Sequence, residues 1–192
     1  MTNARPVPVL LTERLRLTIP SADDAAAMAE FFVTNREHLG PWSPPQPHGI
    51  GDAEFWRARL PVFADDFRRD AALRLALFPR ERTAPSIVGT INFTQIFRGP
   101  FHACYLGYSI AERWEGHGLM REGLEAAIAY AFDELRLHRI MANYVPTNER
   151  SGGLLRRLGF VVEGYARDYL YIDGAWRDHV LTALTNPKVE RP

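Results

Sequence analysis

A glycine-rich turn between a strand-like run and a helix-like run is the feature that most constrains the fold of this chain. The strand-like run covers residues 104–110, and the turn reads Trp114-Glu-Gly116-His-Gly118-Leu-Met120. Apolar residues then recur at helical spacing, at Met120, Leu124, Ile128, Phe132 and Leu135. Such a turn directs unpaired backbone N–H groups and the positive end of the helix dipole at one point. Because glycine has no Cβ, an anion can approach closely, and the pattern predicts an anion site suited to phosphate.

Other motifs with a similar appearance fit less well. A dinucleotide-binding turn needs a third glycine, but position 121 is Arg121. A nucleotide-triphosphate loop ends in Gly-Lys-Ser or Gly-Lys-Thr, which the chain does not contain. The run Gly107-Tyr-Ser109-Ile-Ala111 resembles the nucleophile turn of a hydrolase, yet a helix must follow that serine directly, and Glu112 to Gly118 intervene. A tight turn that binds no ligand stays open as an alternative.

A second signal follows about thirty residues later. Residues 138–145 read as a strand that leads into a segment beginning at Asn148 and ending at Phe160. Leu154, Leu155 and Leu158 have helical spacing, and Gly159 is placed to end that helix. The predicted order is therefore strand, glycine-rich turn, helix, strand, helix, strand.

The rest of the chain alternates between strand and helix signals. We predict strands at residues 10–19, 72–78, 87–96 and 101–111, and a final hairpin that turns at Asp173-Gly174. A helix at 25–38 follows a capping box made by Ser21 and Asp24, and Asp52 caps a second helix that ends near Arg69. The proline-rich loop at 40–47 is expected to be non-helical.

Composition narrows the class of protein. A chain of 192 residues with 46% hydrophobic and 24% charged residues is expected to form one domain over 1–192, with its core at about 10–186. No apolar run approaches the length of a membrane span, and the N-terminus has no secretory pattern, so we expect a soluble cytoplasmic protein. A single cysteine excludes disulfides and a cysteine zinc site, and no histidine pair has metal-ligand spacing. The net charge of zero does not favour direct binding of nucleic acid.

Segments across nearly the whole chain carry a family resemblance. They are Thr12–Leu17, Pro41–Trp42, His102–Ile110, Gly116–Met120, His138–Tyr144, Asn148–Phe160 and Asp173–Val180. Together they resemble acetyl-CoA-dependent N-acetyltransferases of the GNAT superfamily and, within it, the RimJ-type ribosomal-protein-alanine N-acetyltransferase branch. The resemblance implies an α+β fold of the GNAT acyl-CoA N-acyltransferase type. Its central sheet would be mixed and largely antiparallel, with about seven strands, and about four helices would flank it.

The resemblance also implies acetyl-CoA as the coenzyme and a set of residues that bind it. These are Ser109, Ile110, Arg113, Glu115, Gly116, His117, Gly118, Leu119, Met120, Asn143, Asn148, Ser151 and Leu155. The family motif, Gln/Arg-x-x-Gly-x-Gly/Ala, can be read in two registers, from Arg113 or from Glu115. In the second register a carboxylate stands where an amide or a cation is usual, and we expect Glu115 to face solvent or to pair with a nearby base.

For catalysis, the resemblance points to Ser151, Asn148 and Tyr108. A hydroxyl at Ser151 can donate a proton to the leaving thiolate, although it can equally satisfy the backbone where the helix starts, and Asn148 can be that helix's cap. Where many family members have a glutamate on a central strand, this chain has Cys104 and Asn143. Deprotonation of the amine through water could be assisted by Glu37, Tyr105, Tyr108 or Asp168. For the substrate groove we name Glu37, Trp42, Tyr105 and Asp168.

Three functions are compatible with these residues. The first is acetylation of a protein N-terminus, by resemblance that of a ribosomal protein, because a terminal α-amine with a pKa of roughly 8 is partly neutral near pH 7 without a strong base. The second is acetylation of a small amine such as a polyamine or an antibiotic. The third is a non-catalytic acyl-CoA-binding module. We expect a monomer or homodimer, with possible ribosome association and no metal.

Overall fold

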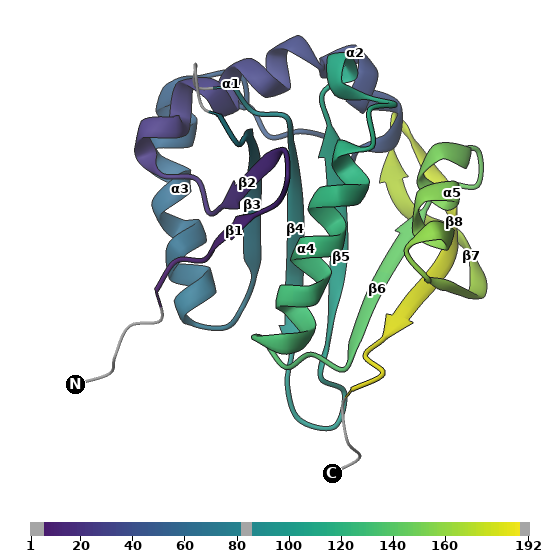
Figure 1. The fold of residues 1–192 in the computed structure, drawn as a ribbon. Coiled ribbons are helices and arrows are strands. Elements are labelled where there is room, and N and C mark those ends of the chain that lie inside the picture. The colour runs from purple at the N-terminus through teal and green to yellow at the C-terminus, as the bar shows by residue number, and fades with distance from the viewer. Residues whose placement is uncertain (1–5, 82–85, 189–192) are drawn as a thin grey trace.

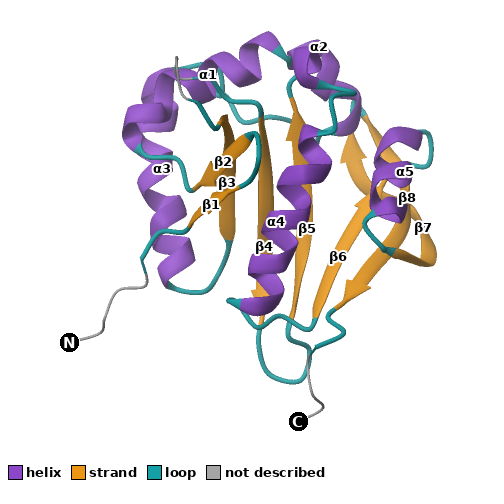
Figure 2. Cartoon of the chain, in the orientation of Figure 1, coloured by secondary structure: helices purple, strands orange, loops and turns teal. Residues whose placement is uncertain are grey.

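The computed structural model describes residues 6–81 and 86–188, which form one mixed sheet with helices on both faces (Figures 1 and 2). Within these ranges the strands are β1 (Val9–Leu11), β2 (Leu15–Thr18), β3 (Leu73–Pro79), β4 (Gly89–Phe97), β5 (Ala103–Ile110), β6 (Arg139–Tyr144), β7 (Val161–Ile172) and β8 (Ala175–Thr185). The α-helices are α1 (Ala25–Thr34), α2 (Arg36–Leu39), α3 (Ala53–Arg68), α4 (Leu119–Asp133) and α5 (Glu149–Arg157). Short 3-10 helices cover Ala22–Asp24, Gly40–Trp42 and Glu112–Trp114.

The sheet is antiparallel except at one place. Its strand order is β1-β2-β3-β4-β5-β6-β8-β7, and β5 and β6 are the parallel neighbours, joined through α4. They pair only from Ala103 to Tyr105 on β5, whereas β5 stays paired with β4 as far as Ile110. Figure 1 shows β5 and β6 diverging beyond their short paired region. The last part of β5 therefore has one edge without a β6 partner.

Alternation along the strands separates the two faces of the sheet. On β3, Leu77 points to α4, so closely that a Cβ built on Gly123 would lie 2.8 Å from its Cδ2 atom. Arg74, three residues earlier, points the other way and binds Asp66 of α3 at 2.6 Å. The helices α4 and α3 therefore cover opposite faces, and the largest buried side chains fill the layers between them and the sheet: Leu15, Leu17, Leu60, Phe67, Leu73, Leu75, Leu77, Phe78, Ile91, Phe93, Leu124 and Leu137.

The strand predicted at residues 10–19 is two strands. β1 folds back on β2, with Val9 opposite Thr18, and the backbone N–H of Thr12 donates to the carbonyl of Leu15 at 2.9 Å to close the turn. This additional strand accounts for a sheet of eight strands where about seven were expected. The alternation continues across the turn, so apolar spacing alone does not reveal it.

The helix predicted at 25–38 is interrupted at Asn35. The side-chain amide of Asn35 donates to the carbonyl of Phe31 at 2.7 Å, and its backbone leaves the helical region, so α1 ends there and the short α2 begins. The expectation that the proline-rich loop is non-helical was also wrong at its start. Gly40–Trp42 forms a 3-10 turn, because Pro41 lies in its first turn, where a missing N–H removes no helical hydrogen bond.

Several local predictions are confirmed. Asp52 caps α3 by accepting a hydrogen bond from the N–H of Glu54 at 2.9 Å. Gly159 ends α5 with a φ of 88°, in the left-handed region that favours glycine. Asp173 and Gly174 form the turn between β7 and β8. No helix in the described part of the chain is long and apolar enough to cross a membrane.

Candidate functional site

The residues Glu115–Gly118, called the glycine turn below, connect β5 to α4. Gly116 and Gly118 have φ angles of 79° and 77°, which side chains rarely adopt. The first helical hydrogen bond runs from the N–H of Glu122 to the carbonyl of Gly118, so the amides before it have no partner within the helix. A Cβ built on Gly116 would meet no atom within 4 Å, which leaves open space beside the turn. The turn therefore offers N–H groups without helical partners next to open space, which is the arrangement that an anion site needs.

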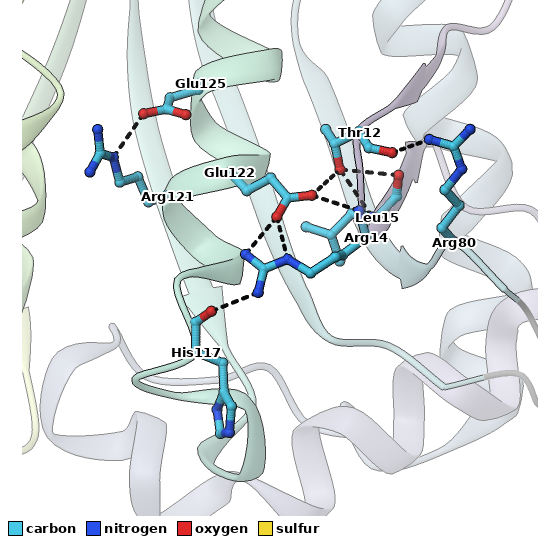
Figure 3. Close-up of polar contacts among 8 residues, drawn as sticks. All are labelled: Thr12, Arg14, Leu15, Arg80, His117, Arg121, Glu122 and Glu125. Atoms are coloured by element: carbon cyan, nitrogen blue, oxygen red, sulfur yellow. Dashed lines mark hydrogen bonds and ion pairs between the residues drawn. The ribbon is translucent and has the colours of Figure 1, made fainter.

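The glycine turn is fixed from one side by Arg14, in the turn between β1 and β2 (Figure 3). The guanidinium of Arg14 contacts the Glu122 carboxylate through Nε and Nη2, each at 2.7 Å, and its Nη1 donates to the carbonyl of His117 at 3.0 Å. A carbonyl oxygen that faced the open side of this turn would repel an anion. The hydrogen bond from Arg14 keeps the His117 carbonyl directed toward the protein. The turn consequently presents N–H groups to its open side.

Glu122 remains ionised because of its hydrogen bonds. Burial alone would raise its pKa, but donors from the Thr12 hydroxyl and from the backbone and side chain of Arg14 outweigh that effect and lower the pKa. Neither Arg14 nor Glu122 was predicted to belong to the site. They lie 108 residues apart, and each has the appearance of an ordinary surface charge in the sequence.

A third residue that was not predicted for the site, Asn35, fixes the segment between β5 and the glycine turn. Its side-chain oxygen accepts a hydrogen bond from the N–H of Glu112 at 2.8 Å, and the residue is buried. The interruption between α1 and α2 thus gives the segment after β5 a specific partner. Arg113, by contrast, is exposed and lies over the ring of Trp114, with its guanidinium carbon 5.7 Å from the ring centre.

The three predicted catalytic residues are brought together where β5 meets α5. Asn148 caps α5, because its side-chain oxygen accepts from the N–H of Ser151 at 3.0 Å. The Ser151 hydroxyl lies 2.8 Å from the Tyr108 hydroxyl, and either can donate. Burial raises the pKa of Tyr108 to about 12, with Ser151 lowering it and Tyr144 raising it to smaller extents. The phenol is therefore protonated at neutral pH and can serve as a donor.

The start of α5 packs directly against β6. A Cβ built on Gly152 would lie 2.8 Å from the ring of Tyr144, so only glycine lets the ring occupy its position. Sequence analysis did not identify Tyr144 as part of the site. The signal was the pair of glycines inside a short helix, since a glycine in a helix interior is costly unless a close contact requires it.

Glu115 forms an ion pair with Arg150 of α5. Of the two expected outcomes for Glu115, solvent exposure or pairing with a base, the structure has the second. Other residues predicted to bind the coenzyme are partly or fully buried. Ser109 and Ile110 are half-buried at the end of β5, and the side chains of Leu119, Met120 and Leu155 are buried.

Asn143 and Tyr105 lie on the opposite face of the sheet from Tyr108, as strand alternation requires. The Asn143 amide donates to the Tyr169 hydroxyl at 3.1 Å, and its oxygen accepts from the N–H of Thr182 at 3.3 Å. Burial raises the pKa of Tyr169, and a hydrogen bond with Tyr105 adds to this. The amide of Asn143 is thus held by β7 and β8.

The proline-rich loop and the β7–β8 turn border a cavity of about 490 Å³. Its lining includes Arg36, Pro44, His48, Asp173 and Gly174. Trp42, which was predicted to belong to the substrate groove, is 41% exposed and does not line this cavity.

Two further predicted groove residues lie outside that cavity. Glu37 is exposed on α2. Asp168 is exposed on β7 with a φ of 46°, and its N–H donates to Asp178 at 2.9 Å. Within residues 6–81 and 86–188, no group of three or more acidic, histidine or cysteine side chains could hold a metal ion. Cys104 is buried, which raises its pKa to about 12 and keeps the thiol protonated.

The chain is similar in sequence and in structure to acetyltransferases. The family described as acetyltransferase (GNAT) domain matches residues 14–161. The ribosomal protein uS5 alanine N-acetyltransferase of Escherichia coli (strain K12) is 49% identical over 179 residues, which cover 93% of this chain and 91% of that protein. The solved ribosomal-protein-S5-alanine acetyltransferase from Vibrio fischeri superposes with a TM-score of 0.90 at 36% identity, covering 96% of this chain and 100% of that one. Mycobacterium smegmatis RimJ in complex with CoA-disulfide gives a TM-score of 0.86 at 26% identity, covering 98% and 91%.

Proposed function

The chain belongs to the GNAT family of acetyltransferases, and from that premise we propose that it acetylates the N-terminal α-amine of a protein, with a ribosomal protein as the acceptor. It is an acetyl-CoA-dependent N-acetyltransferase with the GNAT fold. The observation that carries the proposal is the hydrogen-bonded pair Tyr108 and Ser151, beside two central strands that have no carboxylate side chain.

The residues of the glycine turn fit the coenzyme. The turn offers backbone N–H groups without helical partners, two glycines with positive φ and, at Gly116, open space where a Cβ would otherwise lie. In this proposal Gly116, His117, Gly118, Leu119 and Met120 hold the pyrophosphate through their backbone. When bound, acetyl-CoA supplies the activated acetyl group as a thioester.

Ser151 and Tyr108 are placed to move a proton in the reaction. With acetyl-CoA bound, the Ser151 hydroxyl would donate a proton to the leaving sulfur, and the Tyr108 hydroxyl, 2.8 Å away, would donate in turn to Ser151. The proton that the attacking amine loses would return to Tyr108 through water. Because the pKa of Tyr108 is raised to about 12, the phenol carries its proton across the physiological range. Asn148 fixes the first turn of α5 and so orients Ser151.

The nature of the acceptor follows from the absence of a strong base. Neither β5, Ala103–Ile110, nor β6, Arg139–Tyr144, carries an aspartate or a glutamate. An α-amine with a pKa of roughly 8 is about a tenth or more neutral near pH 7, whereas a lysine amine near 10.4 is below about 0.1% neutral. The chain is therefore better suited to N-termini than to lysine side chains. The names of the similar proteins support a ribosomal acceptor, which would be met in the cytoplasm.

A competition between acceptors tests this function. We expect a peptide that begins with alanine to be acetylated, as read by mass spectrometry, and the same peptide with a blocked N-terminus and an internal lysine to stay unmodified. Efficient labelling of the blocked peptide would contradict α-amine selectivity. Turnover of a polyamine or an aminoglycoside with no peptide modified would favour the small-amine function, and CoA binding without any acceptor would favour the non-catalytic one.

A further inference from the structure

The ion pair between Glu115 and Arg150 connects the segments that follow β5 and β6. Glu115 is in the glycine turn, which begins after β5, and Arg150 is in the first turn of α5, which begins after β6. The two strands have stopped pairing well before these segments begin. The ion pair therefore connects the glycine turn to α5 across the gap where β5 and β6 no longer pair. It lies next to the N–H groups of the glycine turn.

The guanidinium of Arg150 has N–H groups beyond the one that contacts Glu115. Its side chain is 77% exposed, and its Nη1 contacts the Glu115 carboxylate. Among the residues that the structure describes, Glu115 is its one ion-pair partner. An exposed ion pair of this kind is held weakly, because water screens it. A phosphate binds the planar guanidinium through two charge-assisted hydrogen bonds and can displace the carboxylate.

We infer that Arg150 is a ligand of the coenzyme pyrophosphate and that Glu115 holds its guanidinium beside the glycine turn until the coenzyme binds. The inference rests on the proposed placement of the pyrophosphate at that turn. In the register of the family motif that begins at Glu115, it accounts for the departure of this chain from the motif. The position that is usually an amide or a cation is acidic here, and the cation comes from α5.

Under this inference, Arg150 strengthens coenzyme binding and Glu115 weakens it. Arg150 attracts the pyrophosphate, while Glu115 repels it and competes for the same guanidinium. A pair that only fastened the turn to α5 would act with one sign, because loss of either partner would loosen the same contact. The two single variants therefore distinguish a phosphate ligand from a structural connection.

Calorimetric titration of CoA at two salt concentrations tests the inference. We expect Arg150→Gln to weaken binding about tenfold or more and to reduce its dependence on salt. We expect Glu115→Gln to bind no more weakly than the parent, and the double variant to bind no more weakly than Arg150→Gln, because the repulsion by Glu115 is lost in both. Arg68→Gln is the matched control, since Arg68 is an exposed arginine paired with Asp65 on α3, on the other face of the sheet.

Three results would overturn the inference. Equal weakening by Glu115→Gln and Arg150→Gln would assign the pair a structural role. Affinity of Arg150→Gln within about twofold of Arg68→Gln would remove Arg150 from the site, because a lost charge-assisted hydrogen bond costs more than that. A deficit seen with CoA but not with dephospho-CoA would assign Arg150 to the 3′-phosphate. Unchanged CoA affinity in Gly118→Val would instead reject the placement of the coenzyme, so the two failures are distinguishable.

Discussion

The hydroxyl of Tyr108, on β5, lies 2.8 Å from the hydroxyl of Ser151, in the first turn of α5. The two residues are 43 positions apart in the chain. Strand β5 carries the phenol on the face that α5 covers, and Asn148 fixes the turn that presents the serine. In the proposed reaction, this contact is where a proton is delivered to the leaving sulfur.

The first prediction concerns that proton. Ser151→Ala should lower kcat by about 10²-fold or more while changing CoA affinity little, because a proton donor acts mainly in the transition state. Tyr108→Phe removes the second hydroxyl of the pair and should give a smaller loss of kcat. Steady-state kinetics with calorimetric CoA binding separates the two effects. A kcat of Ser151→Ala within about threefold of the parent would mean that water or another group supplies the proton.

The second prediction concerns the glycine turn. Gly118→Val should destabilise the fold by about 1–2 kcal/mol, because a side chain at positive φ is strained. It should also weaken CoA binding, because its Cβ would lie 3.6 Å from Nη2 of Arg14 and disturb the residue that holds the turn in place. Gly99→Val is the matched control. Gly99 has a φ of 67° in open space between β4 and β5, so its variant should lose similar stability and keep CoA affinity. Equal CoA binding by the two variants would contradict the role of the turn.

The third prediction is a dependence of stability on pH. The pKa of Glu122 is lowered in the folded state, so its stabilising contribution is complete above the unfolded value, near 4.5, and is lost as the pH falls through the lower folded value. Glu122→Gln should therefore be less stable at pH 7, by on the order of 1–3 kcal/mol, and less sensitive to acid. Urea denaturation at pH 7, 4 and 3 measures this.

Glu125→Gln serves as the control for that measurement. Glu125 pairs with Arg121 on the exposed side of α4, with both side chains 52% exposed (Figure 3). Its loss should change the free energy of unfolding by no more than about 0.5 kcal/mol at any of these pH values. Parallel acid profiles for the parent and Glu122→Gln would remove Glu122 as the acid-sensitive group.

The fourth prediction compares two adjacent glycines in α5. Gly153→Ala should stabilise the protein by about 0.5–1 kcal/mol, because alanine favours a helix and the new Cβ would meet only the flexible Arg157 side chain, at 3.5 Å. Gly152→Ala has the same helical benefit but collides with the ring of Tyr144 at 2.8 Å. It should be less stable than Gly153→Ala by about 1 kcal/mol or more. Thermal unfolding measures the difference, and two variants of equal stability would show that Tyr144 moves away freely.

The sequence by itself determined the features that depend on near neighbours. Asp52 was predicted to cap a helix and Gly159 to end one, and Asn148 was named as a candidate cap, which it is. The glycine turn and the Asp173-Gly174 hairpin were also placed correctly. Each of these features depends on backbone angles and on hydrogen bonds between residues a few positions apart. The residue types at those positions determine both. The motifs that indicated the GNAT family are of the same local kind.

Only the tertiary structure decided which distant residues complete the site. Arg14 reaches the carbonyl of His117 across 103 residues, and Asn35 reaches the N–H of Glu112 across 77. These two residues lie where a continuous sequence pattern gave a wrong prediction. Arg14 is in the turn that divides the strand predicted at 10–19, and Asn35 is at the break in the helix predicted at 25–38. Apolar periodicity continues through a tight turn or a helix break, and the partner that makes the interruption favourable belongs to another element. Its position is set by strand register and helix packing, which no short stretch of sequence contains.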